Sequence, residues 1–322
     1  MSGDGWNPVG RREAALRISQ AALAGAAIAG GAGFFAGRAT AGTDALAIPD
    51  WRVPGAGAPG RVVAARGDDP ARNVRRVLAA LGGMESFVRP GDVVLVKPNV
   101  GWDRLPEQAA NTDPKVVAEI VRACRAAGAR KVVVADISCN DPQRCFARSG
   151  IRAAAEEAGA EVLDGRQLRL VPAAIAGAAA GLEVIEPLLA ATRVVNVPVA
   201  KHHGLSRVTV GMKNWIGVLG RGRSRLHQDI DRSIAELAAT FRPTLTVVDA
   251  TRVLLGNGPQ GGSLDDVRAA GAVCAGVDPV LCDAWGAAQL EVRPSSLRFI
   301  AEAERRGLGR SDLALVRELG KG

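Results

Sequence analysis

Residues 91–99 read Gly-Asp-Val-Val-Leu-Val-Lys-Pro-Asn, and this stretch decides the fold class. Its four consecutive apolar residues, 93–96, predict a strand that is buried on both faces. Asp113-Pro114 then begins a helix with an N-capping aspartate and a proline in the first turn, and Gly128 ends that helix. A further apolar strand over 131–135 follows. Strand, helix and strand in this order are typical of a parallel α/β sheet.

The same alternation continues on both sides of this stretch. Toward the N-terminus it predicts a strand over 61–66 and a helix over 70–81. Toward the C-terminus it predicts strands over 161–163, 193–197 and 244–248, and helices over 144–158, 208–218 and 229–241. We therefore expect an α/β fold with a largely parallel, Rossmann-like sheet and helices on both faces. Ligands of such sheets usually bind beyond the carboxyl ends of the strands.

The first 41 residues differ from the rest and are typical of an export signal. Arg11-Arg12 is a twin arginine, residues 21–37 carry no charge, and Ala39 to Ala41 supply an A-x-A cleavage pattern. An uncleaved membrane anchor is the alternative, although the apolar stretch is weakly hydrophobic and short for a span. The protein would then leave the cytoplasm through the twin-arginine machinery and be periplasmic, or stay anchored facing outward.

The remaining chain divides into three further parts. Residues 42–60 are rich in proline and glycine and predict a linker. Residues 61–292 hold the α/β pattern, within which the alanine-rich stretch 171–181 is expected at the surface. Residues 293–322 predict a C-terminal helical tail without evident chemistry.

Composition argues against a nucleic-acid-binding protein. The 322 residues carry a net charge of +8, but the 41 basic residues are scattered along the chain and form no dense block. Aromatic residues make up 3% and tyrosine is absent, which disfavours base stacking. We therefore expect no nucleic-acid partner, and we expect a small anionic or acidic molecule instead.

The five cysteines do not predict a metal cluster. No C-x-x-C occurs, and the spacing fits neither a zinc ribbon nor an iron–sulfur cluster. Cys139 and Cys145 could form a disulfide in an oxidising compartment, and the sequence leaves this open. Cys124, Cys274 and Cys282 are expected as small buried hydrophobic residues.

The densest polar segment of the chain contains several residues of types that are rare in the sequence. Only six lysines and three histidines occur in the sequence, and Lys201, His202, His203 and Lys213 lie close together along the chain. The apolar residues before Lys201 would desolvate its amine and lower its pKa, which suits a general base or a carboxylate-binding group. Adjacent residues of an extended chain point in opposite directions, so one histidine of the pair should enter a given site. The alternative is a satisfied structural network.

Other polar residues sit at positions where they could join the same site. Lys97 and Asn99 follow the strand 93–96, Asn214 follows Lys213, and His227 lies on a glycine- and arginine-rich loop. The loop 256–262, which includes Gly256, Asn257 and Gly258, would let backbone approach a ligand closely, or would be a mobile surface loop. The sequence thus predicts three catalytic residues, Lys201, His203 and Lys213. The predicted ligand-binding residues are Lys97, Asn99, Asn214, Asn257, Gly256 and Gly258. The predicted metal ligands are His202, His203 and His227.

The ordered set of these segments resembles the family known as domain of unknown function 362 (DUF362). The resemblance rests on 91–99, 111–114, 201–203, 211–217 and 256–259, and it covers roughly residues 61–290. The family usually has a lysine, another residue and then a histidine near Lys201, so His203 is the better match to the shared histidine. Some members carry an added iron–sulfur segment, which this chain lacks.

The resemblance and the export signal together imply an exported protein. It would be an enzyme acting on an acidic small molecule, with a redox or isomerase-type reaction and a transition metal among the open possibilities. The twin-arginine route carries folded proteins, and it is often used by proteins that take up a cofactor first. The alternative is a binding protein, or a scaffold for a redox partner, that holds an anion without chemistry.

Overall fold

The computed structural model describes residues 45–56 and 62–320. The predicted signal segment, with its twin arginine and uncharged stretch, lies outside these described residues. Within the described residues no helix is both long and apolar enough to cross a membrane.

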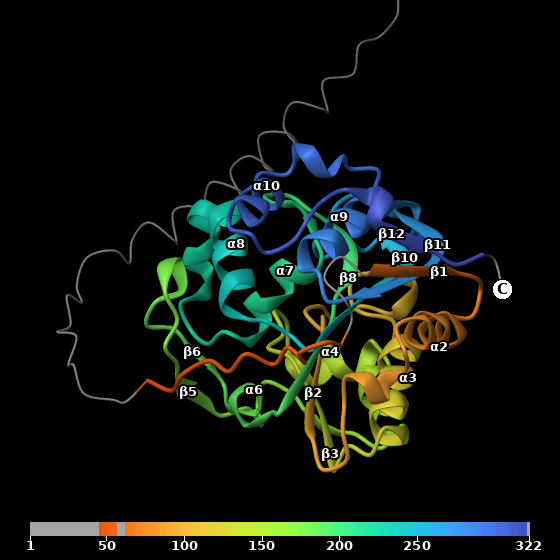
Figure 1. The fold of residues 1–322 in the computed structure, drawn as a ribbon. Coiled ribbons are helices and arrows are strands. Elements are labelled where there is room, and N and C mark those ends of the chain that lie inside the picture. Colours follow the sequence, from red (N-terminus) through yellow and green to blue (C-terminus); the bar gives the residue numbers. More distant parts are fainter. Residues whose placement is uncertain (1–44, 57–61, 321–322) are drawn as a thin grey trace, which may run out of the picture. The chain divides into compact units, whose positions relative to one another are not determined.

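The domain is built on a mixed, mostly parallel sheet, as the sequence predicts (Figure 1). Its strands run in the order β12-β1-β11-β10-β7-β2-β3-β4, and β8 and β9 extend it beside β10. The pairs from β10 to β4 are parallel, and β11 is antiparallel to both of its neighbours. The strand bounds are β1 Val62–Arg66, β2 Val93–Pro98, β3 Lys131–Ala135, β4 Glu161–Leu163, β7 Arg193–Val197, β8 Val199–His203, β9 Arg207–Thr209, β10 Leu245–Leu254, β11 Val267–Gly276 and β12 Val316–Glu318.

Helices cover both faces of this sheet, because each strand exposes apolar side chains in both directions. One face packs against α2 Pro70–Ala80, α3 Pro114–Ala126, α4 Pro142–Arg148 and α5 Ile151–Glu157. The other face packs against α7 Gly211–Asn214, α8 Ile230–Thr240, α9 Pro279–Gln289 and α10 Arg298–Arg305. In Figure 1 the orange and yellow α2 and α3 lie on a different side of the strands from the blue α9 and α10.

A third apolar cluster covers the part of the sheet formed by β2 and β3. It contains α6 Glu186–Ala190 and the small hairpin β5 Leu170–Pro172 and β6 Glu183–Ile185. Trp51 is buried in the same cluster and donates a hydrogen bond from Nε1 to Ala191 O at 3.0 Å. The end of the predicted linker is therefore part of the packed domain.

Several predicted elements differ from the structure. The helix expected over 144–158 is two helices, because Gly150 adopts φ 72° between them. The helix expected over 208–218 is wrong at its start: Arg207–Thr209 is strand β9, and α7 has only four residues before a 3-10 turn. The stretch 171–181 is not simply surface, since Val171, Ala173, Ile175 and Ala179 are buried.

The strand order places β2 at the point where the chain changes direction in the sheet. β3 and β4 follow on one side of β2, and β7 and β10 follow on its other side. In open α/β sheets such a switch point leaves a crevice outside the carboxyl ends of the strands. Lys97 lies at the carboxyl end of β2, so the topology directs attention to this edge.

Candidate functional site

A cavity of about 280 Å³ opens at the carboxyl edge of β2 and β3. Its wall draws on β8, β9, α7, the 3-10 turn over 223–229 and the segments that follow β2 and β3. The polar side chains that line it come from segments far apart in the sequence: Asn99, Asp136, Cys139, Lys201, His203, Thr209, Lys213, Asn214, Arg223, Ser224 and His227.

Lys97 lies next to this cavity and is fully satisfied. Its Nζ donates to Pro98 O and Asn214 Oδ1, each at 2.9 Å, and pairs with Asp136 Oδ1 at 2.9 Å. Burial lowers the pKa of Lys97, and the Asp136 carboxylate opposes that shift. Two hydrogen bonds and one ion pair thus surround the ammonium, and Lys97 does not line the cavity. The structure makes it a positioning residue.

Asn214 and Asn99 join the lysines into one network. Asn214 Oδ1 accepts from Lys97 and from Asn99 Nδ2, and its own Nδ2 donates to Asn196 Oδ1 at 2.9 Å. Asn99 Oδ1 in turn accepts from Lys201 Nζ at 2.9 Å. Buried amide networks of this kind restrict the geometry of the groups they hold. The two asparagines therefore orient lysines, and Asn99 also borders the cavity.

Lys201 has one open position on its amine. Nζ donates to Asn99 Oδ1 and to Ala110 O, and the side chain lines the cavity. Burial, followed by the charge of Lys213, lowers the pKa of Lys201 to about 7. A neutral amine can keep both hydrogen bonds and direct its lone pair to the third position. Lys201 therefore has the arrangement of a general base that works near neutral pH.

Lys213 has no partner among the residues that the structure describes. Its side chain is 9% exposed and lines the cavity, yet its ammonium makes no hydrogen bond or ion pair there. Burial lowers the pKa of Lys213 to about 8. A buried ammonium without a counter-charge is unfavourable, and an anion in the cavity would supply that charge.

The short helix α7 holds Lys213 in place through a buried carboxylate. Asp283 on α9 accepts hydrogen bonds from the backbone N–H of Gly211 at 2.8 Å and of Met212 at 3.1 Å. Asp283 is fully buried, and burial raises its pKa to about 8. The first turn of α7 is thus tied to the neighbouring helix rather than to solvent.

His203 and His227 face each other across the cavity wall, with ring centroids 6.1 Å apart. His203 Nδ1 accepts from the backbone N–H of Leu205 and Ser206, so its proton is on Nε2. Burial and the charge of Lys213 lower the pKa of His203 to about 3, which keeps the ring neutral. His227 Nδ1 lies 3.2 Å from Ser224 O, which can only accept, so the lone pair of His227 is on Nε2. The pair therefore offers the cavity one N–H donor and one acceptor.

The three histidines do not form the predicted metal site. His202 does not line the cavity, and its Nδ1 accepts from Gly258 N at 3.1 Å. His203 would have to bind a metal through Nε2 while Nδ1 still faced two N–H donors, which leaves no place for the ring proton. Within residues 45–56 and 62–320 no group of three His, Cys, Asp or Glu side chains could hold a metal ion. A transition metal therefore does not fit these residues.

The glycine-rich loop contributes less than the sequence predicts. Asn257 Nδ2 donates to both carboxylate oxygens of Asp266, and neither Asn257 nor Gly256 lines the cavity. Gly258 lies against β8, where an added Cβ would come within 2.0 Å of His202 O. Only Pro259 of this loop borders the cavity. The loop thus packs on the site, and its glycines serve backbone packing.

Four further residues at the cavity were not predicted. Asp136 directly follows strand β3, so the carboxyl-end rule that selected Lys97 would have found it. Thr209 Oγ1 is buried and has no hydrogen-bond partner in the described part of the chain. Arg223 donates to Ile137 O and Ser138 O and adds positive charge to the wall. Cys139 is exposed and borders the cavity, and Cys139 and Cys145 are free thiols in this structure.

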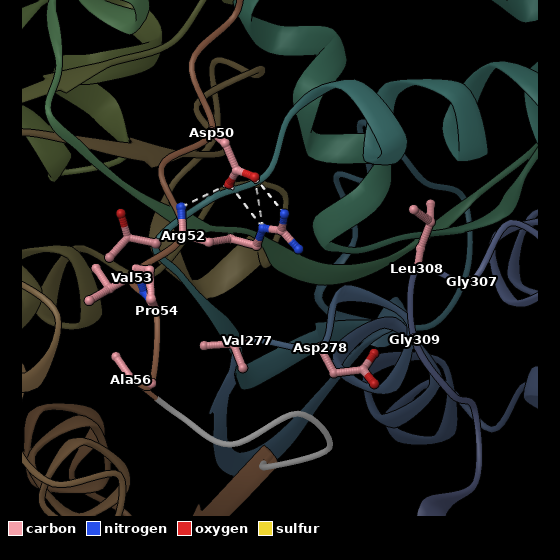
Figure 2. Close-up of a pocket in the computed structure, with 12 residues that line it drawn as sticks. Asp50, Arg52, Val53, Pro54, Ala56, Val277, Asp278, Gly307, Leu308 and Gly309 are labelled. Atoms are coloured by element: carbon pink, nitrogen blue, oxygen red, sulfur yellow. Dashed lines mark hydrogen bonds and ion pairs between the residues drawn. The ribbon is translucent and has the colours of Figure 1, made fainter.

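A larger cavity of about 640 Å³ lies at the opposite edge of the sheet, where β10 begins and β11 ends (Figure 2). Its charged groups already have partners. Asp50 pairs with Arg52, and Asp278 accepts from the backbone N–H of Val280, Leu281 and Arg310. Among the described residues, no lysine or histidine lines it. The candidate site is therefore the smaller cavity.

Comparison with known proteins identifies the family of this chain. Residues 94–288, more than half of the chain, match the family described as "Domain of unknown function (DUF362)". The chain belongs to the DUF362 family. The matched residues include the lysines, histidines and asparagines of the cavity, so the cavity lies wholly within the DUF362 domain. The resemblance seen in the sequence is confirmed.

Two individual proteins are similar to this DUF362 chain. The "Thylakoid-associated protein sll1697" of Synechocystis is 27% identical over 244 residues, which are 73% of this chain and 74% of that protein. The lactate racemase apoprotein from Thermoanaerobacterium thermosaccharolyticum is a distant structural match with a TM-score of 0.38 and 13% identity. That match covers 74% of this chain and 57% of the racemase chain, so this chain spans little more than half of its length.

Proposed function

We propose that this DUF362 protein is an enzyme that binds a small carboxylate-bearing molecule in the cavity and transfers a proton to or from it. The observation that carries the proposal is the buried ammonium of Lys213, which has no partner among the described residues and lines the same cavity as the amine of Lys201. The first group lacks an anion, and the second is near its midpoint of protonation at neutral pH. Pairs of titratable groups with different roles are characteristic of acid–base sites.

Binding would begin with the carboxylate at Lys213. The anion gives the ammonium its missing partner, while the Nε2–H of His203 and the hydroxyl of Thr209 are further donors on the same wall. Because His203 stays neutral, it contributes a hydrogen bond without adding charge. Positive charge from Arg223 extends the preference for acidic ligands.

The proton transfer would take place at Lys201. Its neutral amine accepts a proton from the bound molecule at the open position, and the resulting ammonium keeps its bonds to Asn99 and Ala110 O. The negative charge left on the molecule is stabilised by Lys213 and by the N–H of His203. The reverse transfer from Lys201 completes a reaction such as an isomerisation. General base catalysis of this kind contributes typically about 10²–10⁴-fold to a rate.

Solvent exchange tests the proposal on any acid that the cavity binds. A panel of small carboxylic acids is incubated with the protein in D₂O, and deuterium incorporation is followed by NMR. We expect one class of acid to exchange, with a rate that rises with pH through about 7, the pKa of Lys201. Lys201→Met should abolish exchange and still bind the acid, whereas Lys213→Met should lose binding. Lys201→Arg, which keeps a charge that cannot be removed, should also be inactive.

A binding protein without chemistry is the alternative, and the same cavity supports it. Carboxylates would then raise the melting temperature of the wild type, as ligands of a folded state do, and no acid on the panel would exchange. Absence of both binding and exchange for every acid would refute both functions of the cavity.

We also propose that the chain is exported by the twin-arginine machinery and is periplasmic or anchored outside the cytoplasm. The twin arginine and the uncharged stretch of the sequence support this location. The name of the Synechocystis relative associates that protein with thylakoids, which supports a destination at or beyond a membrane. Cell fractionation of the wild type and of an Arg11→Lys, Arg12→Lys variant tests the route. An equal distribution of the two proteins would contradict it.

A further inference from the structure

Cys139 stands apart from the other four cysteines of the chain. All five are free thiols, and Cys139 is exposed while Cys124, Cys145, Cys274 and Cys282 are buried. Burial raises the pKa of the Cys124 thiol to about 12 and also raises that of Cys145, which keeps both thiols protonated. Since the thiolate is the reactive form, Cys139 is the cysteine open to reaction.

The backbone holds Cys139 at the mouth of the cavity. The N–H groups of Cys139 and Asn140 both donate to Gly101 O, at 2.9 and 3.2 Å. An added Cβ on Gly101 would lie 3.9 Å from Cys139 Sγ, so the thiol packs close to this glycine. The residue is therefore fixed in position, and its side chain borders the same cavity as Lys213 and Arg223.

The cations of the cavity determine which molecules would react with this thiol. Lys213 has no counter-charge among the described residues, and it is more than nine-tenths buried with its side chain in the cavity wall. Cys139 and Lys213 border the same cavity, so one small molecule bound there can contact both. A molecule that reaches Cys139 while carrying a carboxylate can place that carboxylate at Lys213.

We propose that Cys139 is a reactive thiol that forms a mixed disulfide with a low-molecular-weight thiol carrying carboxylate groups, delivered as its disulfide. The Cys139 thiolate attacks one sulfur of the disulfide RS–SR, the S–S bond breaks, and RS⁻ leaves with the electron pair. Cys139 becomes oxidised to Cys–S–SR, and the other half of the reagent is reduced to the thiolate. The adduct occupies the cavity with its carboxylate at Lys213, and external thiol reverses it.

This inference does not depend on the proposed proton transfer. It requires a thiol beside an unpaired cation, whatever molecule the cavity binds in its reduced form. If both hold, formation of the adduct closes the site, and the protein responds to the redox state of its surroundings. The reaction of Cys139 with disulfides and the deuterium exchange of a bound acid are measured separately, so either proposal can fail while the other holds.

Two disulfide reagents of different charge provide the test on the full-length protein. 5,5′-Dithiobis(2-nitrobenzoate) carries a carboxylate on each ring, and 2,2′-dithiodipyridine is neutral. We expect one fast-reacting thiol with the anionic reagent, mapped to Cys139 by peptide mass analysis and lost in Cys139→Ser. Lys213→Met should slow the anionic reagent by about tenfold or more and change the neutral reagent far less. Lys213→Arg, which keeps the charge, should retain most of the anionic rate.

A second measurement on the wild type guards against variants that fold poorly. Added salt should slow the anionic reagent and leave the neutral reagent unchanged, because screening weakens the attraction of the cavity. Equal effects of Lys213→Met on both reagents, or equal effects of salt on both, would overturn the proposal. So would a fast phase that maps to another cysteine, or an internal disulfide between Cys139 and Cys145 in place of the adduct.

Discussion

Lys213→Met should make the protein more stable, although it removes a residue of the candidate site. Burial lowers the pKa of Lys213 from 10.5 to about 8, and the ammonium has no partner among the described residues. The difference between these values corresponds to about 3 kcal/mol of unfavourable free energy, since a tenfold change in proton affinity is worth about 1.4 kcal/mol. Methionine fills similar apolar space without a charge, so the variant avoids this cost.

The gain has a defined dependence on pH. Below pH 8 the folded protein carries the buried charge, and the full cost is present. Between pH 8 and 10.5 the unfolded chain binds a proton that the folded protein has lost, so wild-type stability rises with pH over this range. The advantage of Lys213→Met should therefore be largest at neutral pH and disappear as the pH approaches 10.5. Urea unfolding of both proteins at about pH 7 and about pH 10 measures it.

Lys97→Met is the matched control, since it changes a second buried lysine of the same site. It leaves the Asp136 carboxylate buried without its cation, and breaking such a pair typically costs about 3–5 kcal/mol. The two substitutions should thus have opposite signs at neutral pH. If Lys213→Met were destabilising by a similar amount, the ammonium would have a partner and the reasoning about the cavity would be refuted.

Three further substitutions test residues that hold the site or the core in place. Gly217→Ala should cost about 3 kcal/mol in urea unfolding, because its Cβ would lie 2.1 Å from Asp136 Oδ1, whereas Gly204→Ala, with open space around it, should be neutral. Asp283 should contribute a loss of stability as pH rises from about 4 toward 8, since burial raises its pKa to about 8, whereas the lowered pKa of His203 contributes a gain up to about pH 6.5. The stability of Asp283→Asn relative to the wild type should therefore increase over this range, and a constant difference between the two proteins would refute the assignment. Trp51→Ala should lower the free energy of unfolding by about 3–5 kcal/mol, and a neutral result would show that the segment 45–56 contributes nothing to the core.

The parallel half of the sheet could be predicted because its signals are local. The valine-rich runs predicted at 93–96 and 131–135 are confirmed as β2 and β3, and the helix predicted from Asp113-Pro114 is confirmed as α3. The antiparallel half has no such signal. β11 is rich in alanine and glycine, and its pairing with β1 and β10 depends on contacts between segments distant in sequence. The residues of β9 look amphipathic, and only the turn at Gly204 and Leu205 makes them a hairpin strand.

The candidate site could be located from the sequence, and the roles of its residues could not. Rare lysines and histidines near strand ends lead to the edge of the sheet where the candidate cavity lies. Sequence spacing cannot distinguish Lys97, which has three oxygen partners, from Lys213, which has none among the described residues. Nor can it show that His202 turns toward the loop at Gly258, because that depends on where the loop returns.

The pairing of β1 also determines when this edge of the sheet can form during synthesis. Strand β1, the first of the domain, pairs on one side with β11 and on the other with β12. Both partners are near the end of the chain, and β12 is formed by residues 316–318. Residues 267–318 must therefore be synthesised before both sides of β1 can be covered. Until then β1 remains an open edge, which is the kind of surface that associates with other chains. Removal of β12 would leave one side of β1 permanently open, even with β11 in place.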